Sequence, residues 1–308
     1  MSERFSCSRA ARTRAEPLLA TASRIRRWIA LEQPGAWGHD AVIDSRLQPA
    51  IGGELRRRAR QVDARLIVIR RHGRAADDGA AVTCFVAHST PRACWVEQLT
   101  FDDAAGLLDH DLSPLAAGRS VGGRAVSRGP YLVCTNGAHD PCCAEFGRPL
   151  AAALSVARPA ETWECSHIGG DRFAGNLVIL PEGLYFGWVS PTDAPEVIER
   201  YEAGTIDLAH YRGRSCYPFA VQAAETFIRD RLGLTAVGAL RAIGRGRVDG
   251  DLHEITFATI DGRRVAATVR ARPDPEAWRL TCRAAGRMCP LRYELVDLNV
   301  PMTGSSGR

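Results

Sequence analysis

Two turns rich in cysteine, histidine and glycine constrain this sequence more than any other feature. The first turn spans residues 134–143 and reads CTNGAHDPCC, and the second spans residues 165–171 and reads CSHIGGD. Each begins at the end of a short apolar run. Thiolate and imidazole groups are the donors that soft transition metals prefer. Their crowding in turns that follow strands therefore indicates a metal or redox centre held by loops at the edge of a sheet.

The order of the elements around these turns is typical of the thioredoxin fold. The expected elements are a strand at 131–134, a helix at 143–156, a strand at 162–165, a turn or short helix at 170–175, a hairpin of strands at 176–180 and 184–189, and a helix at 193–203. The last helix should be capped by Asp193 and end at Gly204. Pro149 lies inside the first helix, where it should remove one backbone hydrogen bond and kink the axis.

The whole chain is expected to be an α/β protein with several parts. These are a flexible tail at 1–20, a smaller α/β domain at 21–117, a linker at 118–129, a thioredoxin-like ferredoxin domain at 130–235, a short C-terminal α+β extension at 236–302, and a flexible tail at 303–308. The linker is inferred from its glycines, which lack the Lys-Ser/Thr ending of a phosphate-binding loop.

Apolar and β-branched runs supply the elements of the two flanking parts. In the N-terminal domain we expect strands at 27–32, 65–70, 82–88 and 94–99, a helix at 49–61, and a helix at 102–109 with Asp102 and Asp103 at its start. A helix at 215–231 follows the central hairpin. The extension should hold a hairpin of strands 254–260 and 264–270 around Asp261-Gly262, then a strand at 291–298.

Composition excludes several classes of protein. The 40 basic residues are all arginine and are spread along the chain, so the net charge of +5 gives little support for nucleic-acid binding. No stretch approaches the roughly 18 apolar residues of a transmembrane helix, and we expect no membrane partner. The N-terminus lacks a signal sequence, which predicts a cytoplasmic protein. Ten cysteines in such a protein favour metal ligation, redox chemistry or burial over structural disulfides.

A two-iron, two-sulfide cluster needs four protein ligands, and the two turns can supply them in pairs. The first pair would be Cys134 with Cys142 or Cys143, where the start of a helix favours thiolate over thiol. The second pair would come from the turn between His167 and Asp171. Its two glycines would let the backbone pass close to a cluster without Cβ clashes.

Four motifs carry a resemblance to a known family. They are EQPGAWG at 32–38, CTNGAHDPCC at 134–143, CSHIGGDRFAGN at 165–176 and YRGRS at 211–215. With these motifs the chain resembles the sucrase/ferredoxin-like family, whose members contain a thioredoxin-like ferredoxin domain. The resemblance implies a [2Fe-2S] cluster on a Cys-x8-Cys pair and a His-x3-His pair. By spacing, these ligands fall on Cys134, Cys143, His167 and Asp171.

The fourth position departs from the family pattern, because Asp171 stands where the characterised relatives have histidine. A carboxylate is a harder, anionic donor than imidazole, so it should lower the reduction potential of a cluster. Cys165 is the alternative ligand, since its side chain shares the strand face of His167. The third possibility is that the site is incomplete.

The remaining candidates receive structural roles. Cys142 is expected to be a buried neighbour or spare thiol. His139 and Asp140 should shape the loop, and Arg172 should be a surface arginine. Cys84, Cys94 and Cys216 should be small core residues. Cys282 and Cys289 are the candidates for a second site, although the sequence offers no further ligands beside them.

These observations predict an electron carrier with one [2Fe-2S] cluster of mixed Cys/His ligation and a redox partner protein whose identity the sequence does not give. Two alternatives remain open. One is a thioredoxin-like thiol-disulfide oxidoreductase that uses Cys134 with Cys142 or Cys143, although the usual Cys-x-x-Cys spacing is absent. The other is a binding domain of the same fold without a cluster.

Overall fold

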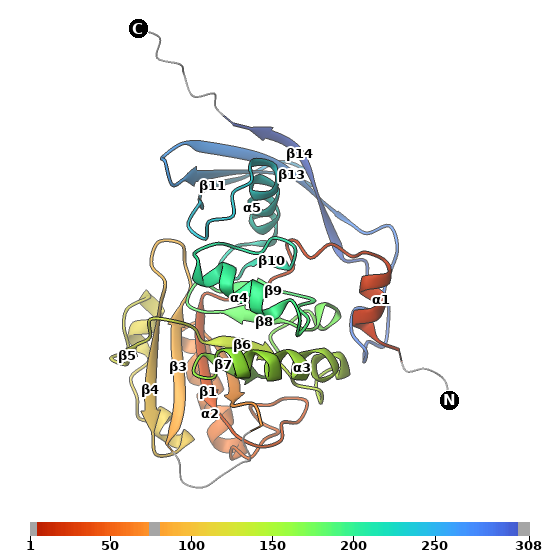
Figure 1. Cartoon of the computed structure of the whole chain (residues 1–308). Coiled ribbons are helices and arrows are strands. Elements are labelled where there is room, and N and C mark those ends of the chain that lie inside the picture. Colours follow the sequence, from red (N-terminus) through yellow and green to blue (C-terminus); the bar gives the residue numbers. More distant parts are fainter. Residues whose placement is uncertain (1–4, 74–80, 301–308) are drawn as a thin grey trace.

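The computed structural model describes residues 5–73 and 81–300. Within these residues the strands form a large mixed sheet of ten strands and a small antiparallel sheet of four. Figure 1 shows the small sheet at the C-terminal end of the molecule, with α3 and α4 in front of one part of the large sheet. The protein is therefore a mixed α/β protein, as the sequence predicts. The expected tail at 303–308 lies outside the described residues.

The large sheet has the strand order β10-β9-β8-β6-β7-β2-β1-β3-β4-β5. Its strands are β1 (Arg27–Glu32), β2 (Arg65–Arg70), β3 (Val82–His88), β4 (Trp95–Phe101), β5 (Arg124–Ala125), β6 (Tyr131–Cys134), β7 (Thr162–Cys165), β8 (Leu177–Ile179), β9 (Leu184–Phe186) and β10 (Tyr211–Arg214). The predicted strands of this region are confirmed, with ends that differ by a few residues. The sequence analysis missed β5 and β10, which are short and polar.

The site-bearing part of the sheet is a β6-α3-β7 unit. Strands β6 and β7 are parallel, and α3 (Pro141–Ala157) connects them. Strand β8 runs antiparallel to β6 and forms the predicted hairpin with β9. Helix α3 starts two residues before its predicted start, because the Asp140 carboxylate caps it by accepting a hydrogen bond from Cys142 N. The helix continues past Pro149.

The N-terminal part and the site-bearing part contribute to one sheet. Strand β2 pairs with β7 in antiparallel register, Ile69 opposite Cys165. The expected linker at 118–129 contains β5, which pairs with β4, so this segment is partly sheet. One buried apolar cluster joins Trp28 and Phe85 to Trp163. The domain boundaries drawn from the sequence stay a prediction.

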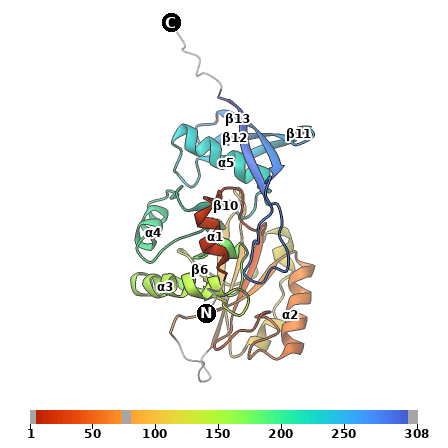
Figure 2. The same ribbon diagram turned by 90° about the vertical axis from the view of Figure 1, so that its right-hand side faces the viewer.

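The N-terminal segment differs from the flexible tail expected at 1–20. Residues Cys7–Thr13 form α1, and Cys7, Ser8 and Ala11 on it are buried. The Ser8 hydroxyl donates to the Ala174 carbonyl at 3.0 Å. Figure 2 shows α1 beside the segment that connects the last two strands of the small sheet. The helix is short and its buried residues are small, so its sequence carried no recognisable apolar pattern.

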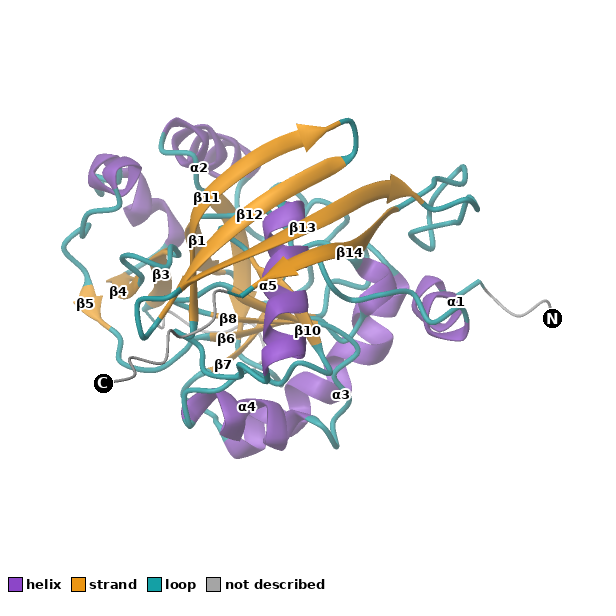
Figure 3. Ribbon diagram, turned by 90° about the horizontal axis from the view of Figure 1, so that it is seen from above, coloured by secondary structure: helices purple, strands orange, loops and turns teal. Residues whose placement is uncertain are grey.

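The small sheet has the order β11-β12-β13-β14, and α5 packs against it, as Figure 3 shows from above. Its strands are β11 (Leu240–Asp249), β12 (Leu252–Thr259), β13 (Arg264–Pro273) and β14 (Leu291–Asn299). The predicted hairpin and last strand are confirmed. The sequence analysis missed β11, whose glycines and arginines conceal its alternation. Helix α5 (Phe219–Leu232) starts four residues later than predicted, after Pro218.

The other helices follow the sequence closely. Helix α2 (Pro49–Gln61) matches its prediction, and α4 (Ala194–Glu202) lies within its predicted range. The predicted helix at 102–109 is a 3-10 turn, η1 (Ala104–Leu108), which the Asp103 carboxylate caps. A second 3-10 turn, η2 (Ser113–Ala117), was not predicted. Asp193 precedes α4, but its carboxylate accepts from Ser190 N instead of capping the helix.

Gly147 is the point at which α3 comes closest to the end of β6. A Cβ atom at this position would lie 2.0 Å from the Cys134 carbonyl oxygen. Gly147→Ala should therefore destabilise the protein by about 1–3 kcal/mol, the usual cost of overpacking, although alanine favours helices. Urea unfolding would measure this change.

Gly53→Ala in α2 is the matched control, because a Cβ atom there would meet nothing within 4 Å. It should be neutral or stabilising by up to about 1 kcal/mol. Equal effects of the two substitutions would contradict the close contact between α3 and β6.

Candidate metal centre

Four elements bring the predicted donor residues to one edge of the sheet. Cys134 is the last residue of β6, and Cys143 lies in the first turn of α3. His167 lies in the turn after β7, and Asp171 opens the 3-10 turn η3 (Asp171–Phe173). Since β6 and β7 are parallel neighbours, the turns that follow them leave the sheet at the same edge.

The four side chains meet in a buried cluster. The donor atoms of Cys134, Cys143 and His167 lie within 4.8 Å of one another. The Cys143 thiol donates to Asp171 Oδ1 at 3.3 Å, and His167 Nδ1 lies 2.9 Å from the same oxygen. Cys134, Cys143 and Asp171 are buried, and His167 is partly exposed. The arrangement gives two soft sulfur donors, one imidazole and one carboxylate.

His139 also belongs to this cluster, although the sequence analysis assigned it to loop shaping. Its donor atoms group with those of His167 and Asp171 within 4.8 Å. The two imidazole rings are stacked, with centroids 3.7 Å apart and an angle of 18° between their planes. The sequence holds no signal for it, because His139 lies in the turn before α3 and meets His167 only where the two turns approach each other. His139 is therefore a further candidate donor.

The Nδ1 atom of His167 has no hydrogen-bond partner among the described residues. It lies at ion-pair distance from Asp171, but the two groups are not aligned as in a hydrogen bond. Buried side-chain nitrogens nearly always have a partner. An orphaned nitrogen that faces thiols and a carboxylate fits a metal ligand, so the donor set is compatible with an iron-sulfur cluster.

The protonation states favour charged donors. A hydrogen bond from Cys143 and the nearby His167 lower the pKa of Cys134 to about 5, despite its burial. Proximity to Cys134, together with burial, raises the pKa of Cys143. Burial opposes the charge of His167, but Asp171 and Cys134 outweigh it and raise its pKa to about 9.

The pKa values of the Asp171 carboxyl and of the His139 imidazole are both lowered, which favours a charged Asp171 and a neutral His139. Burial disfavours the charge of Asp171, but His167 outweighs it and keeps the pKa of the carboxyl low. Burial and repulsion from His167 lower the pKa of His139. The Cys134 thiolate and the Asp171 carboxylate are already in the forms that bind metals, whereas Cys143 and His167 must each release a proton to do so.

The two alternates from the sequence lie outside this cluster. Cys165 is buried on β7 directly opposite Cys134, but it joins neither group of donor atoms found in the described residues. Cys142 points elsewhere, with its sulfur 3.4 Å from the sulfur of Cys282. Consecutive residues on a helix lie about 100° apart around its axis, which is why Cys142 and Cys143 do not face the same site.

The two glycines of the second turn lie against neighbouring side chains. Gly169 and Gly170 have φ values of +96° and +80°. A Cβ atom on them would lie 2.2 Å from Ser23 Oγ and from Arg212 Nη2, respectively. They therefore let the turn pack against Ser23 and Arg212, and their expected role beside a cluster stays a prediction.

Arg212, on β10, holds the second turn in place. Its buried guanidinium donates to the Gly169 carbonyl at 3.2 Å and to Asn176 Oδ1 at 2.7 Å. Asn176 in turn donates to the Gly170 carbonyl. The sequence analysis quoted the motif at 211–215 but gave Arg212 no role. An arginine inside a short polar motif does not reveal that it is buried.

The other residues from the sequence analysis have varied positions. Arg172, expected on the surface, is mostly buried and forms an ion pair with Glu16 at 2.6 Å. Cys84 is buried as expected, whereas Cys216 is half-buried and Cys94 is exposed, so the expectation for Cys94 is wrong. Cys289 is also exposed, away from Cys282 and its neighbours.

The fold and the site define a mixed α/β protein with a buried cysteine, histidine and aspartate cluster at the edge of its large sheet. The sucrase/ferredoxin-like family model matches residues 18–213, more than half of the chain. The chain therefore belongs to the sucrase/ferredoxin-like family, as its motifs suggested. No helix in the described residues is long and apolar enough to cross a membrane.

One curated relative is "Altered inheritance of mitochondria protein 32" from Eremothecium gossypii. It is 31% identical over 113 residues, which cover 32% of this chain and 36% of the relative. The match thus spans about a third of the relative's own length. No solved structure matches the chain.

Arg212→Met should loosen the second turn, because it removes the donor to the Gly169 carbonyl and to the side-chain oxygen of Asn176 inside the protein. The loss in the free energy of unfolding should be about 2–5 kcal/mol, measured by chemical denaturation. Arg200→Met is the control, since Arg200 forms an exposed pair with Glu196 on α4, and its removal should cost less than about 0.5 kcal/mol. Similar losses for both variants would rule out this role of Arg212.

Proposed function

We propose that the protein is an electron carrier that holds one [2Fe-2S] cluster on Cys134, Cys143, His167 and Asp171. The observation that carries this proposal is the convergence of two buried sulfurs, an imidazole nitrogen without an aligned hydrogen bond and a carboxylate at one sheet edge. Such a cluster, when bound, takes up and releases single electrons. The chain would hold no substrate at this site and would convert none.

The strand order supports a thioredoxin-like ferredoxin domain as the carrier. The segment β7-β6-β8-β9 has a parallel β6-α3-β7 unit followed by an antiparallel hairpin, and α4 follows the hairpin. This is the order that the sequence motifs implied. The family to which the chain belongs has "ferredoxin" in its description, which is consistent with this part as the electron-carrying domain.

Each donor has a distinct role in this proposal. Cys134 and Cys143 would hold one iron from the rigid end of β6 and the start of α3. His167 would hold the other iron from the second turn, which Arg212 fixes. Asp171 would be the fourth ligand, a role that its contacts with Cys143 and His167 support. His139, stacked on His167, is the competitor for that position.

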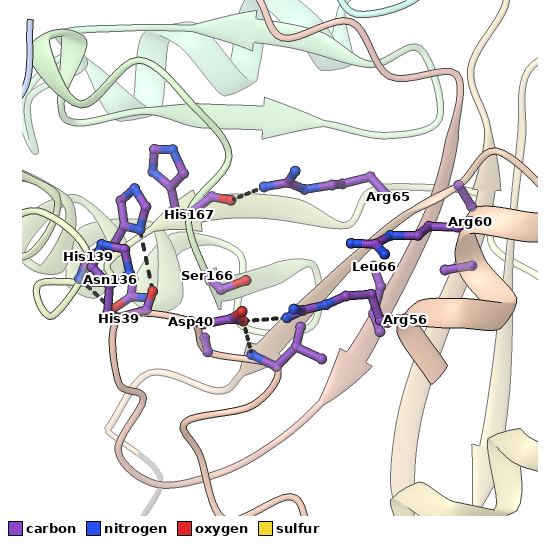
Figure 4. A pocket seen from close by; sticks show the side chains of 14 residues that line it. His39, Asp40, Arg56, Arg60, Arg65, Leu66, Asn136, His139, Ser166 and His167 are labelled. Atoms are coloured by element: carbon purple, nitrogen blue, oxygen red, sulfur yellow. Dashed lines mark hydrogen bonds and ion pairs between the residues drawn. The ribbon is translucent and has the colours of Figure 1, made fainter. Parts of the chain in front are cut away.

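A pocket of about 420 Å³ opens beside the two histidines. It supports the proposal that a redox partner docks on this side of the protein. Figure 4 shows His139 and His167 on one side of the pocket and Arg56, Arg60 and Arg65 on the other. Arg65 donates to the His167 carbonyl at 3.3 Å. An acidic surface on the redox partner would complement these arginines and bring its own cofactor close to the histidines.

The cytoplasm is the proposed compartment. All ten cysteines, each within the described residues, are free, and free thiols persist in reducing compartments. The mitochondrial wording in the relative's name belongs to that protein. It leaves a mitochondrial location of this chain as the competing proposal.

The thiol-disulfide alternative is narrowed by the geometry. Cys142 points away from Cys134, so of the two pairs expected from the sequence only Cys134 and Cys143 lie close enough for a redox disulfide. The low pKa of Cys134, caused by the neighbouring Cys143 and His167, would suit a nucleophilic thiolate. The position of His167 and Asp171 against the same sulfurs favours metal binding instead.

Cys134→Ala and Cys143→Ala should each abolish the visible chromophore, because an iron that loses one of two thiolates becomes open to water. Cys165→Ala should keep it with a modest spectral change. Absorption spectra and iron content of the purified variants measure the outcome. A bleached Cys165→Ala protein beside a coloured Cys143→Ala protein would reassign the ligands.

Asp171→His should raise the reduction potential toward the range of about −150 to +300 mV of His-ligated clusters, since neutral imidazole replaces an anionic donor. The wild type should have a lower potential in the same redox titration. Asp171→Ala should yield an iron-poor or labile protein, whereas His139→Ala should retain its iron.

The reverse result would identify His139, and not Asp171, as the fourth ligand. Iron lost from His139→Ala, kept in Asp171→Ala, and an unchanged potential in Asp171→His would together exclude Asp171. Equal iron in both alanine variants would indicate another group in that position.

A further inference from the structure

A second group of donor atoms lies beside the candidate centre but faces away from it. It consists of Cys7 on α1, Asp140 and Cys142 at the start of α3, and Cys282 in the segment between β13 and β14. One donor atom from each of these residues lies within 4.8 Å of all the others. Cys7, Asp140 and Cys142 are buried, and Cys282 is partly exposed. Along the sequence, Cys7 and Cys282 each lie more than 100 positions from α3, on opposite sides of it.

The distances fit a single tetrahedral ion. The sulfurs of Cys142 and Cys282 are 3.4 Å apart, and the Cys7 sulfur lies 3.7 and 3.8 Å from the two oxygens of Asp140. In a tetrahedral zinc site with Zn–S bonds of about 2.3 Å, the sulfurs are about 3.8 Å from one another. Three sulfurs and one oxygen also form a donor set that zinc accepts.

The surroundings hold the donors and compensate their charge. Backbone N–H groups of Cys142 and Cys282 donate to the two oxygens of Asp140 at 2.9 and 2.7 Å. The N–H of Cys7 points at the Cys282 sulfur at 3.4 Å. The positive end of the 17-residue helix α3 lies at Cys142. Arg9 lines the same hollow as Cys142 and Cys282, where it forms an ion pair with Glu145 at 2.7 Å.

We propose that Cys7, Asp140, Cys142 and Cys282 bind one zinc ion, a site separate from the candidate iron-sulfur centre. Binding replaces the thiol protons, which pass to water. No electron is exchanged. The ion joins α1 and the segment between β13 and β14 to the start of α3, and Figure 2 shows the first two of these side by side.

The site has a structural consequence for the first centre. Cys142 is adjacent to Cys143, so an ion on Cys142 and Asp140 fixes the first turn of α3 from the side opposite the candidate centre. A disulfide between Cys142 and Cys282 is the competing outcome. It would require the sulfurs to approach from 3.4 Å to about 2.05 Å, and it would involve neither Cys7 nor Asp140.

Metal analysis of the full chain tests this site. The protein is purified in buffer without chelator, and zinc and iron are measured together by atomic emission. We expect about one zinc per chain in the wild type, and its loss in Cys7→Ser and Cys282→Ser with iron content unchanged. Cys289→Ser is the matched control, an exposed cysteine of the same segment, and should keep the zinc.

Three results would overturn the proposal: a wild type without zinc, zinc retained in Cys282→Ser, or a Cys142–Cys282 disulfide in the mass spectrum of the unreduced protein. Failure of the iron-sulfur proposal is a different result, because it removes iron and leaves zinc. Cys134→Ser separates the two sites further, since it should lose iron and keep zinc. Zinc lost from Cys134→Ser and kept in Cys7→Ser would place the zinc in the first centre and contradict the proposal.

A second measurement does not depend on whether the variants fold. In the folded wild type, Cys94 and Cys289 should react with an alkylating reagent at once. Cys282, the partly exposed member of the group, should become reactive only after a zinc chelator is added. Mass spectrometry of the digested protein reports each cysteine. The same reactivity of Cys282 with and without chelator would contradict zinc ligation.

Discussion

The parallel pairing of β6 with β7 is the constraint on which the candidate centre depends. It places two turns, whose first residues Cys134 and Cys165 are 31 positions apart in the chain, at one edge of the sheet. The packing of α3 at Gly147 brings its first turn, and with it Cys143, beside Cys134. Neither turn holds a complete donor set alone. The second turn contributes only after Arg212, from the far strand β10, fixes the backbone between His167 and Asp171.

Charge inside the centre is balanced in a way that suits metal binding. The Cys134 thiolate and the Asp171 carboxylate face the imidazole of His167 in a buried environment. Unpaired charges at such depth would be strongly unfavourable, so the proton on His167 compensates them. A cationic cluster core can take the place of that proton. The metal-free arrangement is thus already polarised toward ligation, which links the electrostatics of the fold to its proposed function.

The sequence predicted the parts whose information is local. Strands such as β6 and β7 are apolar runs with clear ends, and Cys134, Cys143, His167 and Asp171 stand in motifs of fixed spacing. Residues that act through long-range contacts were missed or misassigned. Cys7 lies in a segment expected to be flexible, and it meets Cys282 only in three dimensions. His139 was assigned to the loop, because stacking of its ring on His167 depends on how two turns approach each other. Strand β11 was not predicted, because its arginines and glycines hide the alternation of apolar residues that is typical of a strand.

Iron and acid-labile sulfide in freshly purified protein test the central claim most directly. The proposed centre predicts about two irons and two sulfides per chain, and both should disappear together in the Cys134→Ala and Cys143→Ala variants. A colourless wild type that contains neither iron nor sulfide, with Cys134 and Cys143 joined in a reducible disulfide, would contradict it and favour thiol-disulfide exchange.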